Sequence, residues 1–201
     1  VKDIAALDAP PHPDFDEAEG SAFHGFAKEV YDTGKSLTDE QKLIARFWSD
    51  DAMLTPTPAG HWISIVMQIA DRDALPAEVI ASTLAKLGCA QSDAFVSCWS
   101  TKFKYNLLRP VTYIKRRIDK AWEPLLITPP FPEYTSGHSC QSGAASTALT
   151  AVFGEEFAFD DATYVDEGLP VRSFSSFAAA SDEAAMSRLY GGIHFRFGIE
   201  N

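Results

Sequence analysis

The stretch that decides the fold is HSCQSGAASTALTAVF, residues 138–153, a run of small and apolar residues without proline. It follows residues 119–137, which contain four prolines and are predicted to be irregular. The pattern therefore predicts a helix that begins at about His138, where the proline-rich loop ends, and continues to Phe153.

Helices are predicted on both sides of this run. The segment TDEQ (38–41) has the form of a capping box and is predicted to open a helix that reaches about Asp50. No long segment alternates with a period of two residues, and no internal repeat is visible. The fold class is therefore predicted to be all-α. Further helices are expected from about His61, over 76–88, over 92–109 and over 176–190.

The length of the chain, 201 residues, fits one domain. Hydrophobic residues make up 46% and charged residues 22%, as in ordinary globular proteins. Residues 1–35 begin with an acidic stretch that contains three prolines, and we expect an extended or wrapping segment there. Residues 36–201 are predicted to form the helical-bundle domain, with loops over 51–60 and 154–172.

The formal net charge of −11 argues against nucleic acid and against an anionic membrane surface as partners. The longest apolar run, residues 61–70, is too short to span a bilayer, and no signal peptide is visible. Cys89, Cys98 and Cys140 form no metal-ligand motif. They are expected to be three free thiols, or one disulfide and one thiol.

Cationic residues gather in one part of this acidic chain. Seven of the 17 lie between positions 102 and 120, where Asp119 is the one acidic residue. Lys102 and Arg109 are seven residues apart, so on a helix both point to the same side. Two interpretations stay open. The cations could offset a helix dipole and contact water, or they could form a site for an anion.

The segment YTSGHS, residues 134–139, lies where the proline-rich loop enters the predicted helix. Backbone N–H groups at a helix N-terminus, made accessible by Gly137, can bind an anion. Ser136 adds a hydroxyl group and His138 adds a titratable ring. The alternative is ordinary N-capping by Thr135 or Ser136.

A third polar group lies near the end of the sequence. Ser187 and Arg188 end the last predicted helix, and His194 follows two glycines. A single histidine near a chain end is more often structural than catalytic. His194, however, follows an arginine, and the first cluster also contains an arginine. Its neighbours Phe195 and Phe197 could pack beneath its ring.

Together, the three segments resemble the signature of vanadium-dependent haloperoxidases and type 2 phosphatidic acid phosphatases. The first part, Lys-x6-Arg-Pro, is matched at 102–110, and the second, Pro-Ser-Gly-His, at 135–138 with threonine in place of proline. The third, Ser-Arg-x5-His-x3-Asp, is matched at 187–198 except that Gly198 stands where the phosphatases carry an aspartate that orients the histidine. The resemblance covers about three-quarters of the chain, from Ile44 to the end.

Several details resemble the haloperoxidase branch. Trp99 lies three residues before Lys102, and Phe131 lies in TPPFPEYTSGHS. The stretches NLLRPVTYI and SRLYGGIHFRF look like those of bacterial iodoperoxidases. The resemblance implies a helical bundle of the vanadium haloperoxidase and acid phosphatase type. Because the chain ends seven residues after His194, we expect the bundle to lack a C-terminal element.

The resemblance also implies a cofactor, substrates and surroundings. The cofactor is vanadate, for which phosphate is a competitor or substitute. Hydrogen peroxide and a halide, with iodide favoured, are the substrates, and the product is a halogenating species of the hypohalous acid type. Vanadium keeps its oxidation state, so no haem is needed. The family resemblance favours a periplasmic or secreted location and allows a homo-oligomer.

Residue roles follow from the same resemblance. His194 would bind vanadium through a ring nitrogen, which must then be neutral at that atom. His138 would be the acid–base residue. Lys102 would bind the oxyanion and polarise peroxide. The other expected contacts to the oxyanion come from Arg109, Arg188, the Ser136 hydroxyl and the Gly137 N–H. Trp99 and Phe131 are candidates for the surroundings of the cofactor or for a halide site.

Two other functions are weighed against this one. In an acid phosphatase, His194 would attack a phosphate ester to form a phosphohistidine, and His138 would protonate the leaving oxygen. The third possibility is an inactive module that binds an anion, which is disfavoured because every ligand type of the signature is retained.

Overall fold

The computed structural model describes residues 9–51 and 56–200. Within these ranges the chain forms eight helices and one pair of short strands. The helices are α1 (Ala22–Lys35), α2 (Asp39–Phe47), α3 (Thr57–Arg72), α4 (Ala77–Tyr105), α5 (Pro110–Arg117), α6 (Gly137–Phe153), α7 (Phe177–Tyr190) and α8 (Arg196–Ile199). The strands are β1 (Phe159–Asp161) and β2 (Arg172–Phe174).

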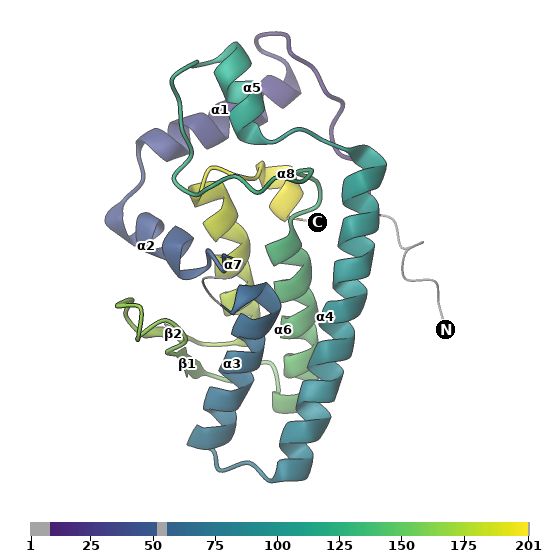
Figure 1. Cartoon of the computed structure of the whole chain (residues 1–201), viewed down its shortest axis with the longest axis vertical. Coiled ribbons are helices and arrows are strands. Elements are labelled where there is room, and N and C mark those ends of the chain that lie inside the picture. The colour runs from purple at the N-terminus through teal and green to yellow at the C-terminus, as the bar shows by residue number, and fades with distance from the viewer. Residues whose placement is uncertain (1–8, 52–55, 201) are drawn as a thin grey trace.

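Four helices, α3, α4, α6 and α7, run along the length of the molecule (Figure 1). Helix α6 packs between α4 and α7, and α3 packs on α4 and α6. Small side chains on α6, among them Ser142, Ala145 and Ser146, are buried there and allow the neighbouring helices to approach closely. The run of small residues at 138–153 therefore forms the centre of the bundle.

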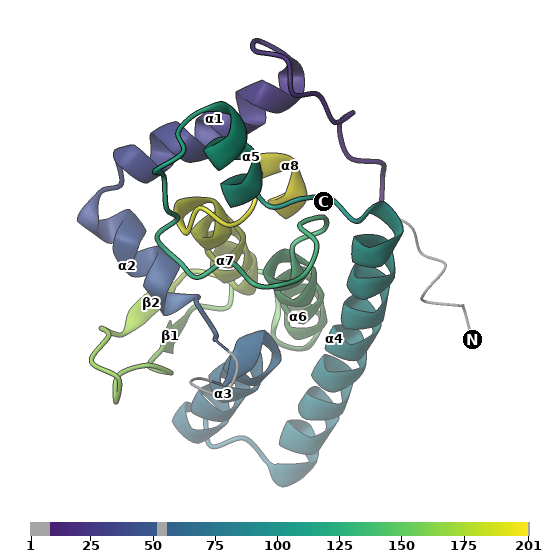
Figure 2. The same ribbon diagram turned by 45° about the horizontal axis from the view of Figure 1, so that its top comes forward.

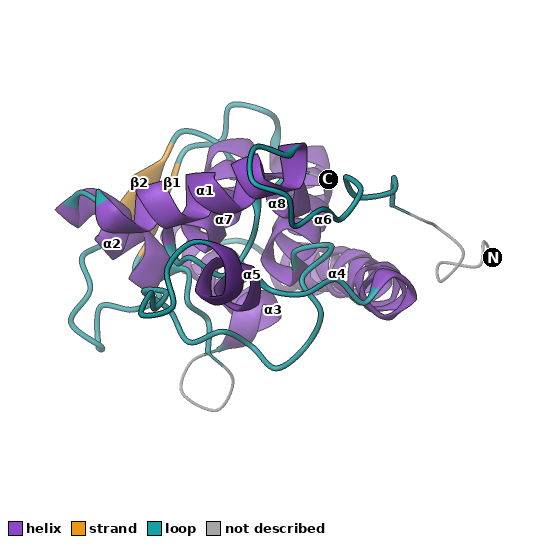
Figure 3. Ribbon diagram, turned by 90° about the horizontal axis from the view of Figure 1, so that it is seen from above, coloured by secondary structure: helices purple, strands orange, loops and turns teal. Residues whose placement is uncertain are grey.

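The remaining helices cover one end of this bundle. Helices α1, α5 and α8 lie across that end, which the tilted view brings forward (Figure 2). Seen from above, α1 lies over α7, and the two strands pair at one side of the molecule (Figure 3). Helix α2 packs against α7. The end covered by α1, α5 and α8 is also where the three sequence motifs meet.

The apolar core has two parts. One lies inside the bundle and includes Trp48, Trp62 and Leu149. The other lies beneath α1, α5 and α8 and includes Phe23 and Tyr113. The second also contains residues directly beside the motif residues, namely Leu107, Tyr134, Leu189 and Phe195. Apolar neighbours in sequence thus anchor the polar residues of the motifs.

Helix starts agree well with their sequence signals. The capping box at Thr38 has both of its hydrogen bonds, and the Ser176 hydroxyl accepts from Ala179 N–H at the start of α7. Helix α6 begins at Gly137, one residue before the predicted start. The all-α class predicted from the sequence is confirmed, with two short strands as an addition: β1 lies inside the predicted loop 154–172, and β2 begins at its last residue.

Several predicted boundaries are wrong. One continuous helix, α4, replaces the two predicted over 76–88 and 92–109, since glycine inside a helix costs only about 1 kcal/mol and packing against α3 and α6 outweighs it. Pro110 opens helix α5, where the sequence analysis expected no helix. Helix α3 begins at Thr57, inside the predicted loop 51–60.

The predicted extended segment 1–35 is also partly wrong. Residues 22–35 form helix α1, which Ser21 caps and whose apolar face, with Phe23, Ala27 and Val30, is buried. Residues 1–8 of that segment and 52–55 of the predicted loop lie outside the described residues. In the described part of the chain, no helix has the length and apolar character needed to cross a bilayer. All three cysteines are free thiols.

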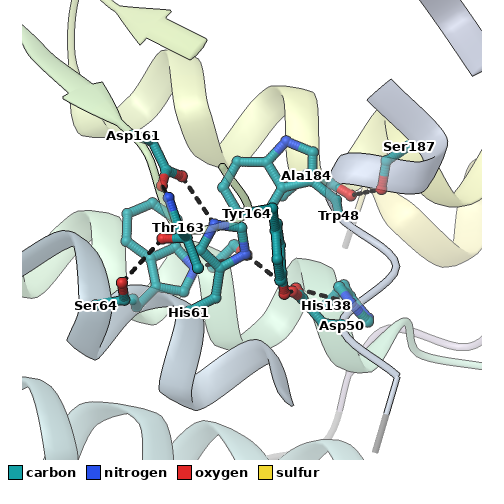
Figure 4. A network of polar contacts seen from close by, with 12 residues as sticks. Trp48, Asp50, His61, Ser64, His138, Asp161, Thr163, Tyr164, Ala184 and Ser187 are labelled. Atoms are coloured by element: carbon teal, nitrogen blue, oxygen red, sulfur yellow. Dashed lines mark hydrogen bonds and ion pairs between the residues drawn. The ribbon is translucent and has the colours of Figure 1, made fainter. Parts of the chain in front are cut away.

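A buried polar network ties α2, α3 and β1 together (Figure 4). His61 Nδ1 lies 2.9 Å from Asp50 Oδ1, and its Nε2 lies 2.8 Å from Asp161 Oδ2. The Tyr164 hydroxyl donates to the same Asp50 oxygen. The ring of His61 stacks on Trp48 with a centroid distance of 4.4 Å. The network therefore fixes Asp50, which lines the cavity described below.

His61 is charged in this network. Burial disfavours the charged ring, but hydrogen bonds with Asp161 and Asp50 outweigh it and raise the pKa of His61 to about 9. Burial likewise opposes ionisation of Asp50, yet His138 and His61 hold the pKa of this carboxyl well below its usual value. His61 is therefore an imidazolium between two carboxylates at neutral pH.

This charge makes stability depend on pH in a defined direction. Because the folded-state pKa is raised, the stabilisation is complete below the unfolded-state value of about 6.5 and is lost as pH rises through 9. We expect it to be worth about 3 kcal/mol or less. The free energy of unfolding in urea, measured from pH 6 to 10, should fall more steeply in the wild type than in His61→Gln. Parallel curves for the two proteins would contradict the charged His61.

Candidate active site

A cavity of about 520 Å³ opens at the covered end of the bundle. Residues of the second and third sequence motifs line it, together with Trp99 on α4, Asp50 in the segment after α2, and the proline-rich loop. Predicted site residues in its wall are Trp99, Phe131, Gly137, His138, Arg188 and His194. Lys102, Arg109 and Ser136 do not line the cavity and lie behind this wall.

Lys102 is fully buried in α4. Its Nζ donates to the carbonyl oxygens of Pro132 and Glu133, both at 2.9 Å. The ammonium lies 5.3 Å from the ring centre of Phe131 and 5.8 Å from that of Trp99. Burial lowers the pKa of Lys102. Lys102 therefore holds the proline-rich loop against α4, and its ammonium lies beside two aromatic rings of the cavity wall.

Arg109 connects the proline-rich loop to the segment after α7. Its Nε donates to Phe131 O at 2.8 Å, and its Nη1 donates to Ile193 O at 2.9 Å. Nη1 also lies 2.9 Å from His194 Nε2. The guanidinium packs over the Phe131 ring at 5.0 Å. The first and third sequence motifs are thereby in direct contact.

The two site arginines have hydrogen-bonding capacity left over. Arg188 Nη1 donates to Trp48 O at 2.7 Å. Among the described residues, however, Arg188 Nε and Arg109 Nη2 have no hydrogen-bond partner although both are buried. A buried, unpaired donor is unfavourable by about 1–3 kcal/mol, and more for a charged group. An oxyanion is the kind of ligand that satisfies such donors.

Ser136 and Gly137 start helix α6. The Ser136 hydroxyl accepts from Ser139 N–H at 3.3 Å, so Ser136 is the N-cap residue, in agreement with the capping interpretation. Its O–H hydrogen is still available for donation. A Cβ at Gly137 would lie 3.4 Å from the Trp99 ring, a tight contact. Glycine therefore lets this ring pack against the start of α6.

Each of the two site histidines contacts a carboxylate that the sequence analysis did not single out. His194 Nδ1 lies 2.8 Å from Oε1 of Glu133, which is fully buried. His138 Nε2 lies 3.3 Å from Asp50 Oδ2 (Figure 4). Glu133 lies within the conspicuous TPPFPEYTSGHS stretch, but no spacing rule connects it to His194. Nothing in the sequence connects Asp50 to His138.

Both site histidines are neutral at pH 7. Burial, together with Arg188, lowers the pKa of His138 to about 4 despite the opposing effect of Asp50. Burial and the charges of Arg109 and Lys102 hold the pKa of His194 well below its usual value. The arginines keep their charge, since burial lowers the pKa of Arg109 and of Arg188 only to about 10. The site is thus cationic around two uncharged bases.

The cation-rich segment 102–120 divides into two parts. Lys102 and Arg109 are buried and contact the proline-rich loop. Lys115 and Arg117 on α5 instead form partly exposed ion pairs with Glu123 and Glu17. The dipole-and-solvent interpretation therefore describes the cations of α5, and the anion-site interpretation stays a prediction for Lys102 and Arg109.

In the described part of the chain, no group of three or more histidine, cysteine or acidic residues could hold a metal ion. A bare metal cation would need such a group. An oxyanion that is held by arginines and contacts one histidine needs no such group. The residues present fit that kind of ligand.

Comparisons with known proteins identify the family and the fold. A family model described as the VCPO second helical-bundle domain matches residues 117–201. A bacterial vanadium-dependent iodoperoxidase of known structure is 47% identical, with a TM-score of 0.93 over 98% of this chain and 50% of that protein. No curated protein sequence matches the chain.

Two further structures support the fold alone. The apo form of a bacterial vanadium-dependent chloroperoxidase is 21% identical, with a TM-score of 0.74, and covers 98% of this chain and 49% of its own. The holo form is 19% identical, with a TM-score of 0.67 over 88% and 43%. The chain spans about half the length of each solved structure that it matches. Because the chain is 47% identical to the iodoperoxidase over 98% of its own residues, it belongs to the vanadium-dependent haloperoxidase family.

Proposed function

We propose that this chain forms the catalytic site of a vanadium-dependent haloperoxidase, which uses hydrogen peroxide to oxidise a halide to a hypohalous acid-type species. The observation that carries the proposal is the pair of buried, unpaired N–H groups on Arg109 and Arg188 beside the neutral His194. The resemblance to a protein named an iodoperoxidase favours iodide as the halide.

The chain binds the oxyanion through its buried cations. Arg109 Nη2 and Arg188 Nε donate to its oxygens, and the N-terminus of α6 at Gly137 adds a favourable dipole. His194 Nε2 would hold vanadium, with that bond replacing its hydrogen bond with Arg109 Nη1. When bound, vanadate supplies the Lewis acid that activates hydrogen peroxide toward halide.

Lys102 supplies a fixed positive charge. An ammonium group has three N–H donors, and two of them are used on the carbonyl groups of Pro132 and Glu133. The third is left to polarise the peroxide. Because the side chain is fully buried and held by two hydrogen bonds, the charge is already in position before substrate arrives.

His138 is the acid–base residue of the proposal. It lines the cavity, and its Nε2 faces the Asp50 carboxylate. With the ring hydrogen on Nε2, the lone pair of Nδ1 is free to accept the proton of hydrogen peroxide and to return it later. Asp50 stabilises the imidazolium that forms. The charged His61 behind Asp50 keeps that carboxylate ionised.

An acid phosphatase is the second candidate, because the same donors and the same His194 Nε2 suit a phosphate ester. In that reaction Nε2 attacks phosphorus, and His138, once protonated, donates its proton to the leaving oxygen. An inactive anion-binding module needs neither His138 in the cavity wall nor a carboxylate against it, so the contact with Asp50 favours an enzyme.

The two enzymes differ in what activates them. Folded protein dialysed against orthovanadate should oxidise iodide in the presence of hydrogen peroxide, and inorganic phosphate should slow its reconstitution by competing for Arg109 and Arg188. Triiodide absorbance follows the reaction, and circular dichroism verifies the fold. Hydrolysis of an aryl phosphate by vanadate-free protein, with no iodide oxidation after reconstitution, would instead identify a phosphatase.

The two histidines should fail in different ways. His194→Ala removes the only direct ligand, so vanadium should no longer be retained through gel filtration. His138→Ala keeps that ligand and both arginines, so vanadium stays bound while iodide oxidation falls by about 10²–10⁴-fold. Vanadium per chain is measured by mass spectrometry beside the rate, with His24→Ala on α1 as the control. Equal vanadium retention in the two site variants would refute these roles.

A further inference from the structure

We propose that Glu133 is the positioning residue that fixes the orientation and the tautomer of His194, and that residue 198 is glycine because the Glu133 carboxylate occupies the space of its side chain. The inference rests on the proposed function for its effect on the bound oxyanion. The arrangement of the histidine itself can be tested without any cofactor.

Glu133 is held at both of its ends. Its backbone N–H donates to Leu107 O at 2.9 Å, and its backbone oxygen accepts from Lys102 Nζ at 2.9 Å. Its side-chain Oε1 lies 2.8 Å from His194 Nδ1 and accepts from Phe195 N–H at 3.1 Å. The side chain is fully buried. The position of this carboxylate is therefore fixed independently of any ligand.

The contacts of Oε1 determine the tautomer of His194. The carboxylate oxygen accepts the hydrogen of Nδ1, so the lone pair of the neutral ring is on Nε2. Nε2 then accepts from Arg109 Nη1, which lies 2.9 Å away. The opposite tautomer would direct a lone pair at the carboxylate and an N–H at the guanidinium. Only with the hydrogen on Nδ1 does Nε2 carry a lone pair, which accepts from Arg109 here and could bind vanadium or attack phosphorus in place of that hydrogen bond.

Gly198 makes room for this carboxylate. A Cβ at position 198 would lie 2.2 Å from Glu133 Oε1, 2.9 Å from its Cδ and 3.0 Å from its Oε2. No side chain at this position is compatible with Glu133 where it is. Gly198 is not among the glycines with positive φ, so the backbone conformation does not demand glycine. The requirement is steric, and it comes from Glu133.

The same distances show that the two positions could exchange roles. In an aspartate, standard bond lengths separate Cβ from the carboxylate oxygens by about 2.4 Å. A Cβ at position 198 is 2.2 Å from the present site of Oε1. An aspartate there could thus place one oxygen close to His194 Nδ1, provided that Glu133 is shortened. The backbone at this point is fixed, because Gly198 O accepts from Ser136 N–H at 2.8 Å.

The experiment compares Glu133→Ala, Glu133→Gln, Gly198→Asp and the double variant Glu133→Ala with Gly198→Asp. The first readout is the ring ¹⁵N chemical shifts of His194 in vanadate-free protein, assigned with His194→Ala. The second is the Kd of orthovanadate, with inorganic phosphate measured in parallel. Thermal unfolding monitors the fold, since a purely structural role would change the Tm and leave the ring shifts as they are.

We expect wild type and Glu133→Gln to show hydrogen on Nδ1, since the amide oxygen is held by Phe195 N–H. Glu133→Ala should show a mixture of tautomers and a Kd about 10–100-fold weaker. Gly198→Asp alone should lower the Tm and disturb the ring. The double variant should restore the Nδ1–H pattern and bring the Kd to within about threefold of wild type.

Two results would overturn the proposal. One is a Glu133→Ala protein with unchanged ring shifts and Kd. The other is a double variant that resembles Glu133→Ala in both readouts. If Glu133→Ala does not fold, Glu133→Gln and the double variant decide, and hydrogen on Nε2 in either of them counts against the assignment. Normal ring shifts with no vanadate binding in wild type would contradict the proposed haloperoxidase function and leave the positioning role of Glu133 supported.

Discussion

The structure depends on the burial of positive charge at one end of a helical bundle. Lys102, Arg109 and Arg188 are almost inaccessible to solvent. Taking charges of one sign out of water is strongly unfavourable unless other groups compensate. Backbone carbonyl groups of the loop before α6, of the segment before His194 and of Trp48 provide part of this compensation. Glu133 is the nearby acidic group, although burial raises the pKa of its carboxyl to about 7. A bound oxyanion would complete the compensation of the positive charge.

This constraint explains why an irregular loop is held in one conformation. The proline-rich segment 119–137 contains little regular structure, yet its carbonyl groups accept hydrogen bonds from Lys102 and Arg109. The rings of Trp99 and Phe131 lie beside the same cations. Through these contacts the loop becomes a wall of the cavity and carries Glu133 to His194.

The two histidines have separate carboxylate partners, and the difference suits separate roles. His194 has Glu133 at Nδ1 and Arg109 at Nε2, which leaves no freedom in its tautomer. His138 lies in the cavity wall with Asp50 on one side. Asp50 in turn contacts the charged His61, and this buried contact helps to keep the Asp50 carboxylate ionised beside His138. A fixed ligand and a base able to gain a proton are what the proposed reaction needs.

The sequence by itself determined the helical class, the starts of α2, α4, α6 and α7, and the three motifs that hold the candidate site residues, because capping patterns and motif spacing are local properties of the chain. It did not show that α4 continues through Gly88 or that α1 is a helix, since both depend on packing partners distant in sequence. It also could not show that Glu133 reaches His194 or that Asp50 reaches His138. Those contacts join residues 61 and 88 positions apart, and only the tertiary structure brings such residues together. The need for glycine at position 198 is also a tertiary effect, because the side chain of Glu133, from another segment, occupies the space beside it.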